Sequence, residues 1–248
     1  METKNKQSKS GIIELIKTLF FAGFIAIVFR SFLFEPFNIP SGSMIPSLLV
    51  GDYLFVSKYS YGYSKYSFPF GILPIQKRFF DDEPKRGDII VFRKPGDEHI
   101  DYIKRLIGLP GDRVQVLNGI LIVNGVKAVR KKTNLGKLSN SLGETIVFSE
   151  YLEQIQDSEV YKIIEASDND FFDNTIEFLV PKNHYFFMGD NRDNSRDSRT
   201  PEVGFVPRIN LIGKAERIFF SHNGSASFYE IWKWHKLIRF SRIGKKIE

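Results

Sequence analysis

The sequence predicts a mainly β protein: an antiparallel β-sheet body with an inserted smaller subdomain, preceded by one N-terminal transmembrane helix. Residues 11–34 form a nearly continuous apolar run, and beyond residue 40 the chain breaks into short runs rich in Val, Ile, Phe and Tyr. Pairs such as Gly-Asp, Pro-Gly and Asn-Gly separate those runs. Short apolar runs between turn residues, with no further long 3.6-residue period, are typical of antiparallel strands.

The N-terminal run fits one helix of about 36 Å, which is enough to cross a hydrocarbon core of about 30 Å. Its charged residues, Glu14, Lys17 and Arg30, lie near its ends, where long side chains reach the interface. The alternatives are a cleaved secretory signal and a buried helix of a soluble protein. Arg30 stands where a signal peptide has small residues, and the run has no polar stripe, so we favour a spanning helix.

The flanks of this helix predict its orientation. Four lysines precede or enter it, at positions 4, 6, 9 and 17, whereas residues 31–57 contain no Lys or Arg. By the positive-inside rule, residues 1–10 are a cytoplasmic tail and the body of the chain lies on the far side of the membrane.

Short runs in the body are the predicted strands. They are Tyr53–Lys58, Asp88–Phe92, Tyr102–Ile107, Val114–Leu117, Leu121–Val123, Thr145–Phe148, Tyr161–Glu165, Tyr185–Met188 and Ala215–Phe220. Asn118-Gly119 and Asn124-Gly125 are two-residue hairpin signals. We expect residues 35–126 and 184–227 to form the β body. Residues 127–183, which are more polar and uneven, are expected to form the inserted subdomain.

Composition and charge exclude several classes. The chain of 248 residues is 42% hydrophobic and has no cysteine, which excludes a disordered chain, a disulfide scaffold and a cysteine nucleophile. Of the net charge of +6, residues 1–17 carry +2 and residues 231–248 carry +5, so the remaining 213 residues sum to −1. A basic stripe for nucleic acid is expected on the folded body. Positive charge at the two ends of the chain instead favours an anionic lipid surface as the binding partner.

The C-terminal segment, residues 228–248, is basic and aromatic. Trp232, Trp234 and Phe240 alternate there with Lys233 and Arg239. The pattern fits an interfacial arm on anionic lipid, and it fits equally a terminal element packed on the body.

Common catalytic motifs are missing from the sequence. The four histidines have no metal-ligand spacing, no Gly-x-Ser-x-Gly or Ser-x-x-Lys motif occurs, and no glycine-rich phosphate loop precedes a helix. We therefore expect no metal and no cofactor. A Ser-His-Asp triad assembled in space stays open, because sequence order does not reveal it.

Three stretches place polar residues in apolar or turn-rich frames. Pro40–Ser47 follows the helix closely and, by composition alone, reads as a turn between anchor and body. Asp101–Gly108 is a predicted strand with adjacent Lys104 and Arg105, one of which should face the core because neighbours on a strand point to opposite sides. A buried lysine is costly unless it is paired or neutral, and a neutral amine is a base. Gly189–Arg199 packs six charged residues into eleven positions.

Together these stretches resemble the type I signal peptidases, the bacterial leader peptidases, which are membrane-bound serine endopeptidases that remove signal peptides from exported proteins. The matching blocks are Pro40–Met44, Gly51-Asp52, Lys58 with Tyr61-Gly62, Arg86–Ile89, Asp101–Gly108 with Pro110–Asp112, Gly189–Arg199 and Gly204–Pro207. Each block alone is weak, whereas their order and separation are specific. The resemblance implies that the antiparallel β body is the catalytic domain.

The resemblance also implies the site. It matches Ser43 to the nucleophile and Lys104 to the general base of a Ser–Lys dyad. It matches Ser195 to a hydroxyl that orients the lysine amine, and Ser41 to a side chain that forms the oxyanion hole with the Ser43 N–H. A lysine with a pKa near 10.4 is neutral in only about one molecule in 10³ at pH 7.4, so burial must lower that pKa.

The charged residues Asp197 and Arg199 match a pair that supports the site in this family. The expected protein is thus a single-pass enzyme of the bacterial inner membrane, with its catalytic domain on the periplasmic side. Its expected partners are exported precursor proteins and the lipid bilayer, with no nucleic acid. A self-cleaving repressor-type Ser–Lys protease is disfavoured by the anchor. A membrane-tethered β binding module without catalysis is the alternative from another class.

Overall fold

The structure of the chain is a computed structural model. It describes residues 2–68, 75, 77–139, 145–156, 158–167, 169–225 and 230–247, with backbone alone for residues 2–11 and 138–139. Parts of the predicted insertion (residues 140–144, 157 and 168) and of the predicted C-terminal segment (228, 229 and 248) lie outside the described residues.

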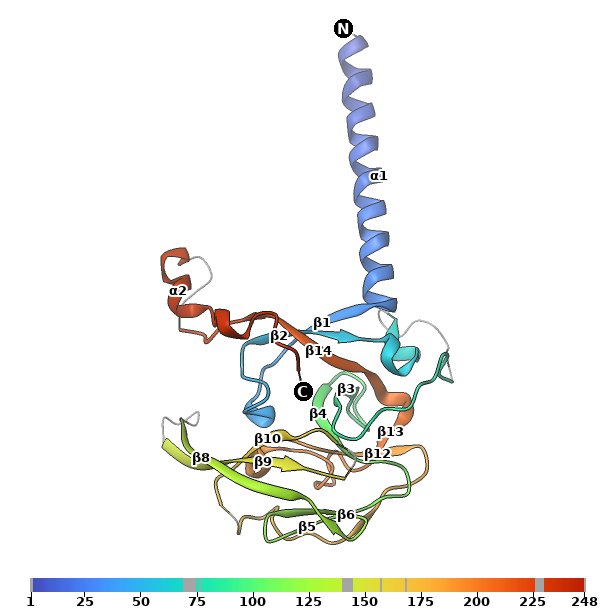
Figure 1. Cartoon of the computed structure of the whole chain (residues 1–248). Coiled ribbons are helices and arrows are strands. Elements are labelled where there is room, and N and C mark those ends of the chain that lie inside the picture. The colour runs from blue at the N-terminus through green and yellow to red at the C-terminus, as the bar shows by residue number, and fades with distance from the viewer. Residues whose placement is uncertain are drawn as a thin grey trace.

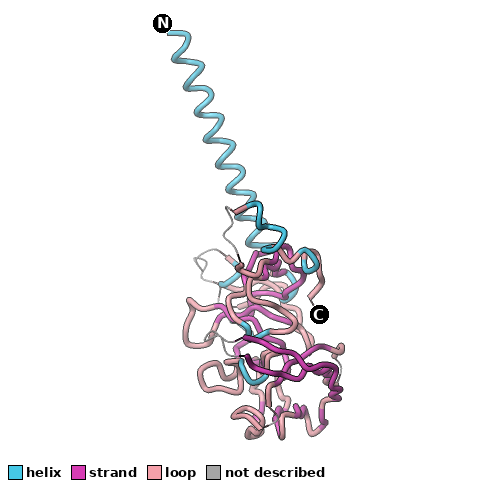
Figure 2. Tube along the Cα trace, turned by 90° about the vertical axis from the view of Figure 1, so that its left-hand side faces the viewer, coloured by secondary structure: helices cyan, strands magenta, loops and turns pink. Residues whose placement is uncertain are grey.

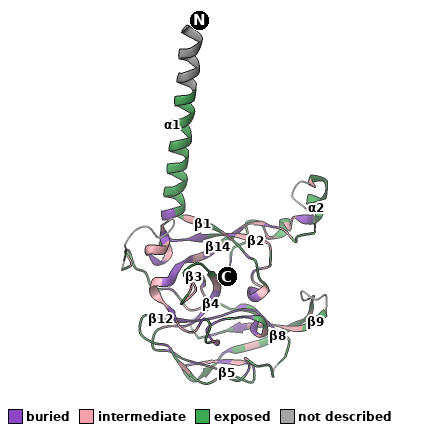
Figure 3. Cartoon of the chain, turned by 180° about the vertical axis from the view of Figure 1, so that it is seen from behind, coloured by how far each residue is buried: buried purple, intermediate pink, exposed green. Residues whose placement is uncertain are grey.

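The N-terminal helix α1 (Glu2–Phe32) projects from one end of the β body (Figures 1 and 2). Its segment Ile12–Phe32 is long and apolar enough to cross a membrane. Its surface is exposed along most of its described length (Figure 3). An apolar helix that buries none of this surface in the protein is suited to a lipid environment.

Both ends of α1 differ from the prediction of a tail at residues 1–10 and a helix at 11–34. The helix already includes Glu2, and it ends at Phe32 instead of residue 34. It ends there because Phe34 begins a strand and pairs with Ser57, while the Tyr63 hydroxyl donates a 2.9 Å hydrogen bond to the Phe32 carbonyl. Tertiary contacts at the body surface therefore set the helix end.

The main sheet, among the described residues, has seven antiparallel strands. In spatial order they are β1 (Phe34–Asn38), β2 (Asp52–Ser57), β14 (Leu211–Ser221), β3 (Ile89–Arg93), β4 (Asp101–Gly108), β12 (His184–Met188) and β13 (Val206–Pro207). Alternate residues of β3 enter different apolar clusters, with Ile89 and Val91 in one and Ile90 and Phe92 in the other. The main sheet is therefore covered on both faces, as the period of two along a strand requires.

Two smaller sheets form the other part of the body. One contains β11 (Phe178–Leu179), β5 (Arg113–Leu117), β6 (Ile120–Val123) and β7 (Val126–Lys127), and the other contains β10 (Tyr161–Glu165), β9 (Thr145–Gln154) and β8 (Val129–Ser139). Every predicted strand overlaps one of these strands or one of the main sheet. The predicted mainly antiparallel β class is confirmed.

The two predicted hairpin turns are confirmed as well. Leu117 pairs with Ile120, which leaves Asn118-Gly119 as a two-residue loop, and Val123 pairs with Val126 around Asn124-Gly125. All four loop residues have positive φ, between 50° and 78°. Asn and Gly adopt this conformation at low cost, which is why these pairs close hairpins.

The predicted boundary between the body and the insertion, between residues 126 and 127, falls inside β7. Strand β11, from the predicted insertion, pairs with β5 from the predicted body. Val114 of β5, Leu121 of β6 and Ile163 of β10 share one apolar cluster. These contacts join the two predicted parts, and the division of the body at residue 127 stays a prediction.

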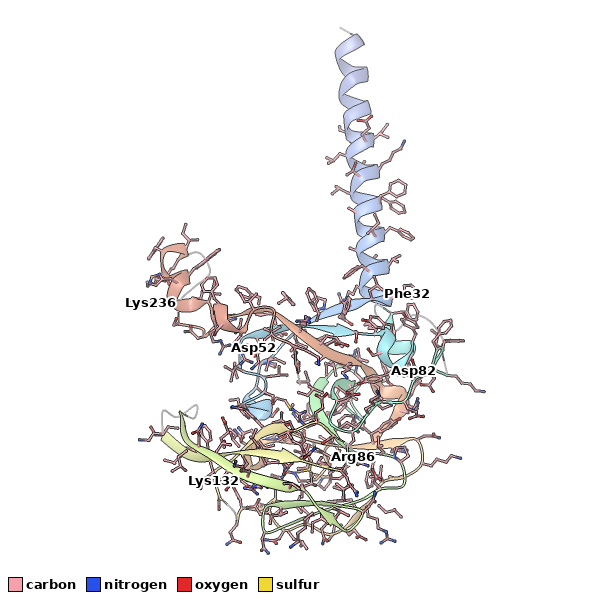
Figure 4. All side chains as sticks on the ribbon, viewed as in Figure 1. Phe32, Asp52, Asp82, Arg86, Lys132 and Lys236 are labelled. Atoms are coloured by element: carbon pink, nitrogen blue, oxygen red, sulfur yellow. The ribbon has the colours of Figure 1, made fainter. Side chains whose placement is uncertain are left out.

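The C-terminal segment packs on the body in its described part. Helix α2 (Trp234–Leu237) buries Leu237, and Ile247 is buried in a core cluster. The Arg242 guanidinium binds the buried carboxylate of Asp52, which lies where this segment crosses the main sheet (Figure 4). Trp232 stays 67% exposed. The packed alternative accounts for the contacts of this segment, and the lipid-binding alternative stays a prediction for its exposed side chains.

Candidate active site

Ser43 lies in a short 3-10 turn, Gly42–Met44, that follows β1. Met44 is fully buried and anchors the turn in the core. Asn191, from the Gly189–Arg199 loop, holds the turn from the other side. Its N–H donates to the Ser43 carbonyl and its side-chain amide donates to the Gly42 carbonyl, each at 3.1 Å. The hydroxyl of Ser43 is thus carried on a backbone that two parts of the chain fix.

Lys104, on β4, meets this hydroxyl. Lys104 Nζ and Ser43 Oγ form a hydrogen bond of 2.6 Å between positions 61 residues apart. The lysine is 5% exposed. Burial lowers its pKa to about 8, with Arg199 acting in the same direction, against the carboxylates of Asp197 and Asp190, which raise it. At pH 7.4 a pKa of 8 leaves about a fifth of the amines neutral, against about one in 10³ for an exposed lysine.

A second buried lysine, Lys58, shows why burial alone does not make a base. Burial lowers its pKa also, but Glu35 opposes this shift. Lys58 Nζ lies 2.6 Å from a Glu35 carboxylate oxygen and donates a 2.7 Å hydrogen bond to the Ser67 carbonyl. These acceptors hold the charged ammonium form. Lys58 therefore has a structural role, because it links Glu35, near the end of α1, to the Ser67 carbonyl.

Ser41 lies on the exposed side of the same turn. Its Oγ is 3.5 Å from Ser43 Oγ, so the two hydroxyls face the same space. An oxyanion-hole donor has to lie close to the nucleophile, so this position is compatible with that role, which stays a prediction for Ser41.

Ser195 is buried at 3% exposure; its hydroxyl helps to lower the pKa of Asp197, but no well-formed hydrogen bond joins it to a residue that the structure describes. It packs against Gly189, where a Cβ atom would lie 2.5 Å from both Ser195 Cβ and the Ser43 carbonyl oxygen. Only glycine fits between them. The structure brings Ser195 to the back of the Ser43 turn without bonding it to Lys104, so its lysine-orienting role stays a prediction.

Asp197 and Arg199 form a buried ion pair next to Ser195. The Arg199 Nε and Nη2 atoms donate to the two oxygens of Asp197 at 2.9 and 2.8 Å. Asp197 also accepts a 3.0 Å hydrogen bond from the Gly189 N–H. Burial favours the neutral acid, but Arg199 and these hydrogen bonds hold the pKa of Asp197 below its ordinary value. The ionised form of Asp197 is therefore favoured, and its negative charge acts on Lys104.

Comparison with known proteins now identifies the family. A family described as signal peptidase, peptidase S26, matches residues 12–220. Signal peptidase I of Rickettsia typhi is 40% identical over 264 residues, covering 100% of this chain and 98% of its own. The chain belongs to the signal peptidase S26 family.

Other members of the S26 family are also similar. Signal peptidase I of Rickettsia conorii is 45% identical over 205 residues, covering 79% of this chain and 75% of its own. A solved signal peptidase I from Enterococcus faecalis is 28% identical and covers 54% of this chain and 97% of its own, with a TM-score of 0.31.

In this member of the S26 family, a cleft of about 440 Å³ opens at the dyad. Its lining comes from residues 40–43 on one side and 100–104 on the other, with Asn194 and Arg196. Strand β4 pairs with β3 through Asp101–Arg105, whereas β12 joins its other edge only from Arg105 onward. Among the described residues, no strand pairs with the other edge of the first half of β4, and this edge borders the cleft.

Arg105 corrects one inference from the strand pattern, which placed only one of the two basic neighbours toward the core. Both are buried, Lys104 at 5% and Arg105 at 2%. They point to opposite faces, but the main sheet is covered on both. Arg105 makes two hydrogen bonds of 2.8 Å to the Asp190 carboxylate. Asp190, and Ser47 which binds it, were missed as site residues, since no local signal marks a partner 85 positions away.

A group of carboxylates with metal-like spacing lies beyond the cleft. Glu165, Asp173 and Asp193 place oxygens within 4.8 Å of one another. Arg130 pairs with Glu165, and the Ala166 and Ser167 N–H groups donate to Asp193 at 2.6 and 3.1 Å. Groups of the chain itself therefore bind the carboxylates of Glu165 and Asp193 and offset much of the acidic charge of this group.

Proposed function

We propose that this protein is a membrane-anchored serine endopeptidase that cleaves signal peptides from exported precursor proteins, with Ser43 as nucleophile and Lys104 as general base. The observation that carries the proposal is the 2.6 Å hydrogen bond between Lys104 Nζ and Ser43 Oγ in a chain of the S26 family. The relatives named signal peptidase I supply the substrate class.

The chemistry follows from the dyad. The neutral Lys104 amine takes the Ser43 proton as Oγ attacks the scissile carbonyl carbon, and the resulting oxyanion is stabilised by the Ser41 hydroxyl and the Ser43 N–H. The lysine ammonium then protonates the leaving amine as the peptide C–N bond breaks, which leaves an acyl ester on Ser43. Lys104 next takes a proton from water, the hydroxide oxygen attacks the ester, and the proton returns to Ser43 Oγ as the new carboxylate departs.

The substrate is proposed to bind as an extended strand along the free edge of β4. Residues 101–104 and 40–43 line opposite sides of the cleft, so the peptide would lie between them with its scissile bond at Ser43. Main-chain hydrogen bonds to a sheet edge bind many sequences alike, which suits a peptidase with many precursors.

The anchor supports the location. Ser43 follows the end of α1 by eleven residues, which span at most about 40 Å when extended, so the nucleophile stays near the membrane surface. We propose a bacterial inner-membrane protein with a cytoplasmic N-terminus and a periplasmic catalytic domain. The exposed Trp232 and Ile231 of the C-terminal segment would contact the same lipid surface.

The test is cleavage of a signal-bearing precursor by the full chain in lipid vesicles. We expect Ser43→Ala and Lys104→Ala to reduce cleavage to background, and the exposed-residue control Lys182→Ala to retain it. Full activity in either dyad variant would overturn the mechanism. A folded wild-type protein that cleaves no precursor would favour the binding-module alternative. Protease accessibility of the body in sealed vesicles tests the orientation separately.

A further inference from the structure

Glu153, on β9, is a fully buried carboxylate that does not line the cleft. Its oxygens accept hydrogen bonds from both terminal nitrogens of Arg192, one of them at 3.1 Å, and from the Tyr161 hydroxyl at 2.7 Å. Arg192 is 2% exposed. A buried ion pair is costly to form and adds little net stability, so its placement calls for another explanation.

One series of hydrogen bonds connects this ion pair to Asp197, whose charge acts on Lys104. The Arg192 backbone carbonyl accepts a 2.6 Å hydrogen bond from Arg199 Nη2. The guanidinium group of Arg199 also donates hydrogen bonds to both oxygens of Asp197. Because Glu153 fixes the Arg192 side chain, it also fixes the carbonyl that positions Arg199 against Asp197.

A second path leads through Tyr161. The Arg105 guanidinium lies over the Tyr161 ring, 4.1 Å from its centroid, and pairs with Asp190. Tyr161 is in turn held by Glu153. Glu153 thus lies behind both carboxylates, Asp197 and Asp190, whose charge acts on Lys104.

The backbone of the inserted sheet makes further contacts with the same loop. The Ile164 N–H of β10 donates to the Asp190 carbonyl at 2.9 Å, and the Ala166 and Ser167 N–H groups bind the Asp193 carboxylate. In Figure 1, β9 and β10 lie below the strands β3 and β4, at about the level of β12. The Gly189–Arg199 loop therefore has a rigid sheet as its support.

We propose that the inserted sheet β8–β9–β10 is the support of the catalytic loop, and that Glu153 is a positioning residue that holds this loop behind Lys104 through Arg192 and Tyr161. The inference rests on the proposed function, since it concerns the environment of the proposed base. It assigns a role to an insertion whose own sequence carries no catalytic motif.

The role has a consequence for the base. Lys104 faces Asp197, Asp190 and Arg199, and its pKa is lowered by burial. If the loop moves away, water reaches the amine and its pKa returns toward the ordinary value of 10.5. A loss of folded protein also lowers the rate, and the folded fraction measured by circular dichroism at each pH corrects the profile for it, so that a remaining shift of the midpoint reports on the amine.

The experiment compares the pH dependence of kcat/KM in Glu153→Gln and wild type, with the full chain in vesicles and a signal-bearing precursor. We expect the midpoint to rise by about 0.5–1 unit, with kcat/KM about 3–10-fold lower at neutral pH and KM unchanged. The matched control is Glu150→Gln on the same strand, because Glu150 binds the exposed Lys162 and Thr133 instead of the loop. Its profile should match wild type.

A second variant is needed because Glu153→Gln leaves the Arg192 charge buried without its carboxylate partner, and this single variant can fail to fold. The double variant Glu153→Gln with Arg192→Met removes both charges, and we expect it to fold and to keep the raised midpoint. A wild-type midpoint in either folded variant overturns the positioning role. An active Ser43→Ala in the same assay would instead overturn the proposed function, so the two failures are distinguishable.

Discussion

Ser47 Oγ donates a 2.5 Å hydrogen bond to Asp190 Oδ2, across 143 positions of the chain. Arg105 holds the same carboxylate through both of its oxygens. The segment that carries Ser43, the strand that carries Lys104 and the Gly189–Arg199 loop therefore meet at one buried acid. The relative position of the two dyad residues depends on that junction.

The first prediction concerns this junction. Ser47→Ala removes a hydrogen bond to a charged acceptor, which typically contributes about 1.5–3 kcal/mol. We expect a lower free energy of unfolding in urea of that order, together with a lower kcat/KM. Ser47→Thr keeps the hydroxyl and serves as control. If Ser47→Ala unfolds at the same urea concentration as wild type, the junction does not contribute as described.

The second prediction is the pH dependence of cleavage. Only the neutral amine of Lys104 accepts the Ser43 proton, and its pKa is about 8. We expect log kcat/KM to rise with a slope near one below pH 8 and to level off above it. Single-turnover rates between pH 6 and 10 measure this. A flat profile across that range would contradict a lysine base.

The third prediction concerns the stability cost of that base. Below pH 8 Lys104 is protonated in the folded and unfolded states, and the folded state carries the full cost of burying the charge. Between pH 8 and 10.5 the folded amine is neutral while the unfolded one still binds a proton, so wild-type stability rises with pH through this window. The difference corresponds to about 3 kcal/mol.

The variant Lys104→Met tests this cost. It fills similar volume without a charge, so we expect it to be inactive but to unfold at higher temperature than wild type at pH 7. The advantage should shrink as the pH rises from 8 to 10.5. Equal stability of both proteins at pH 7 would mean that the amine is solvated in the folded state.

The fourth prediction uses Gly189. A Cβ at this position would lie 2.5 Å from the Ser43 carbonyl oxygen, so Gly189→Ala must push the Ser43 turn or the Ser195 side chain aside. We expect cleavage to fall by about 10²-fold, the typical cost of a displacement near 1 Å in a catalytic site. Gly23→Ala is the control, because nothing lies within 4 Å of a Cβ there. Retained activity in Gly189→Ala would show that the loop adjusts freely.

The fifth prediction concerns Ser195. Its hydroxyl acts on the Asp197 carboxylate but makes no well-formed hydrogen bond to a described residue, so Ser195→Ala should change the free energy of unfolding by less than about 1 kcal/mol. If the hydroxyl orients the Lys104 amine during the reaction, kcat should still fall. Chemical denaturation and kcat measured on the same preparation separate the two effects, and an unchanged kcat would remove Ser195 from the mechanism.

Much of the fold was predictable because its signals are local. The Asn118-Gly119 turn needs positive φ at both residues, and each short run such as Ile120–Val123 alternates buried and less buried side chains. The apolar run of α1 is equally local. The end of that helix was not predictable, because the hydroxyl of Tyr63 and the pairing of Phe34 with Ser57 determine it.

The sequence by itself determined the strand segments, the two hairpin turns, the long apolar helix and, through family blocks, the two residues of the proposed dyad. Only the tertiary structure decided that both Lys104 and Arg105 are buried, that Asp190 joins Ser47 to Arg105, and that Glu153 lies behind the Gly189–Arg199 loop. The physical reason is the distance along the chain over which each kind of interaction acts. Backbone conformation and side-chain alternation depend on neighbouring residues, whereas the burial and pairing of a charge depend on which distant surfaces cover it.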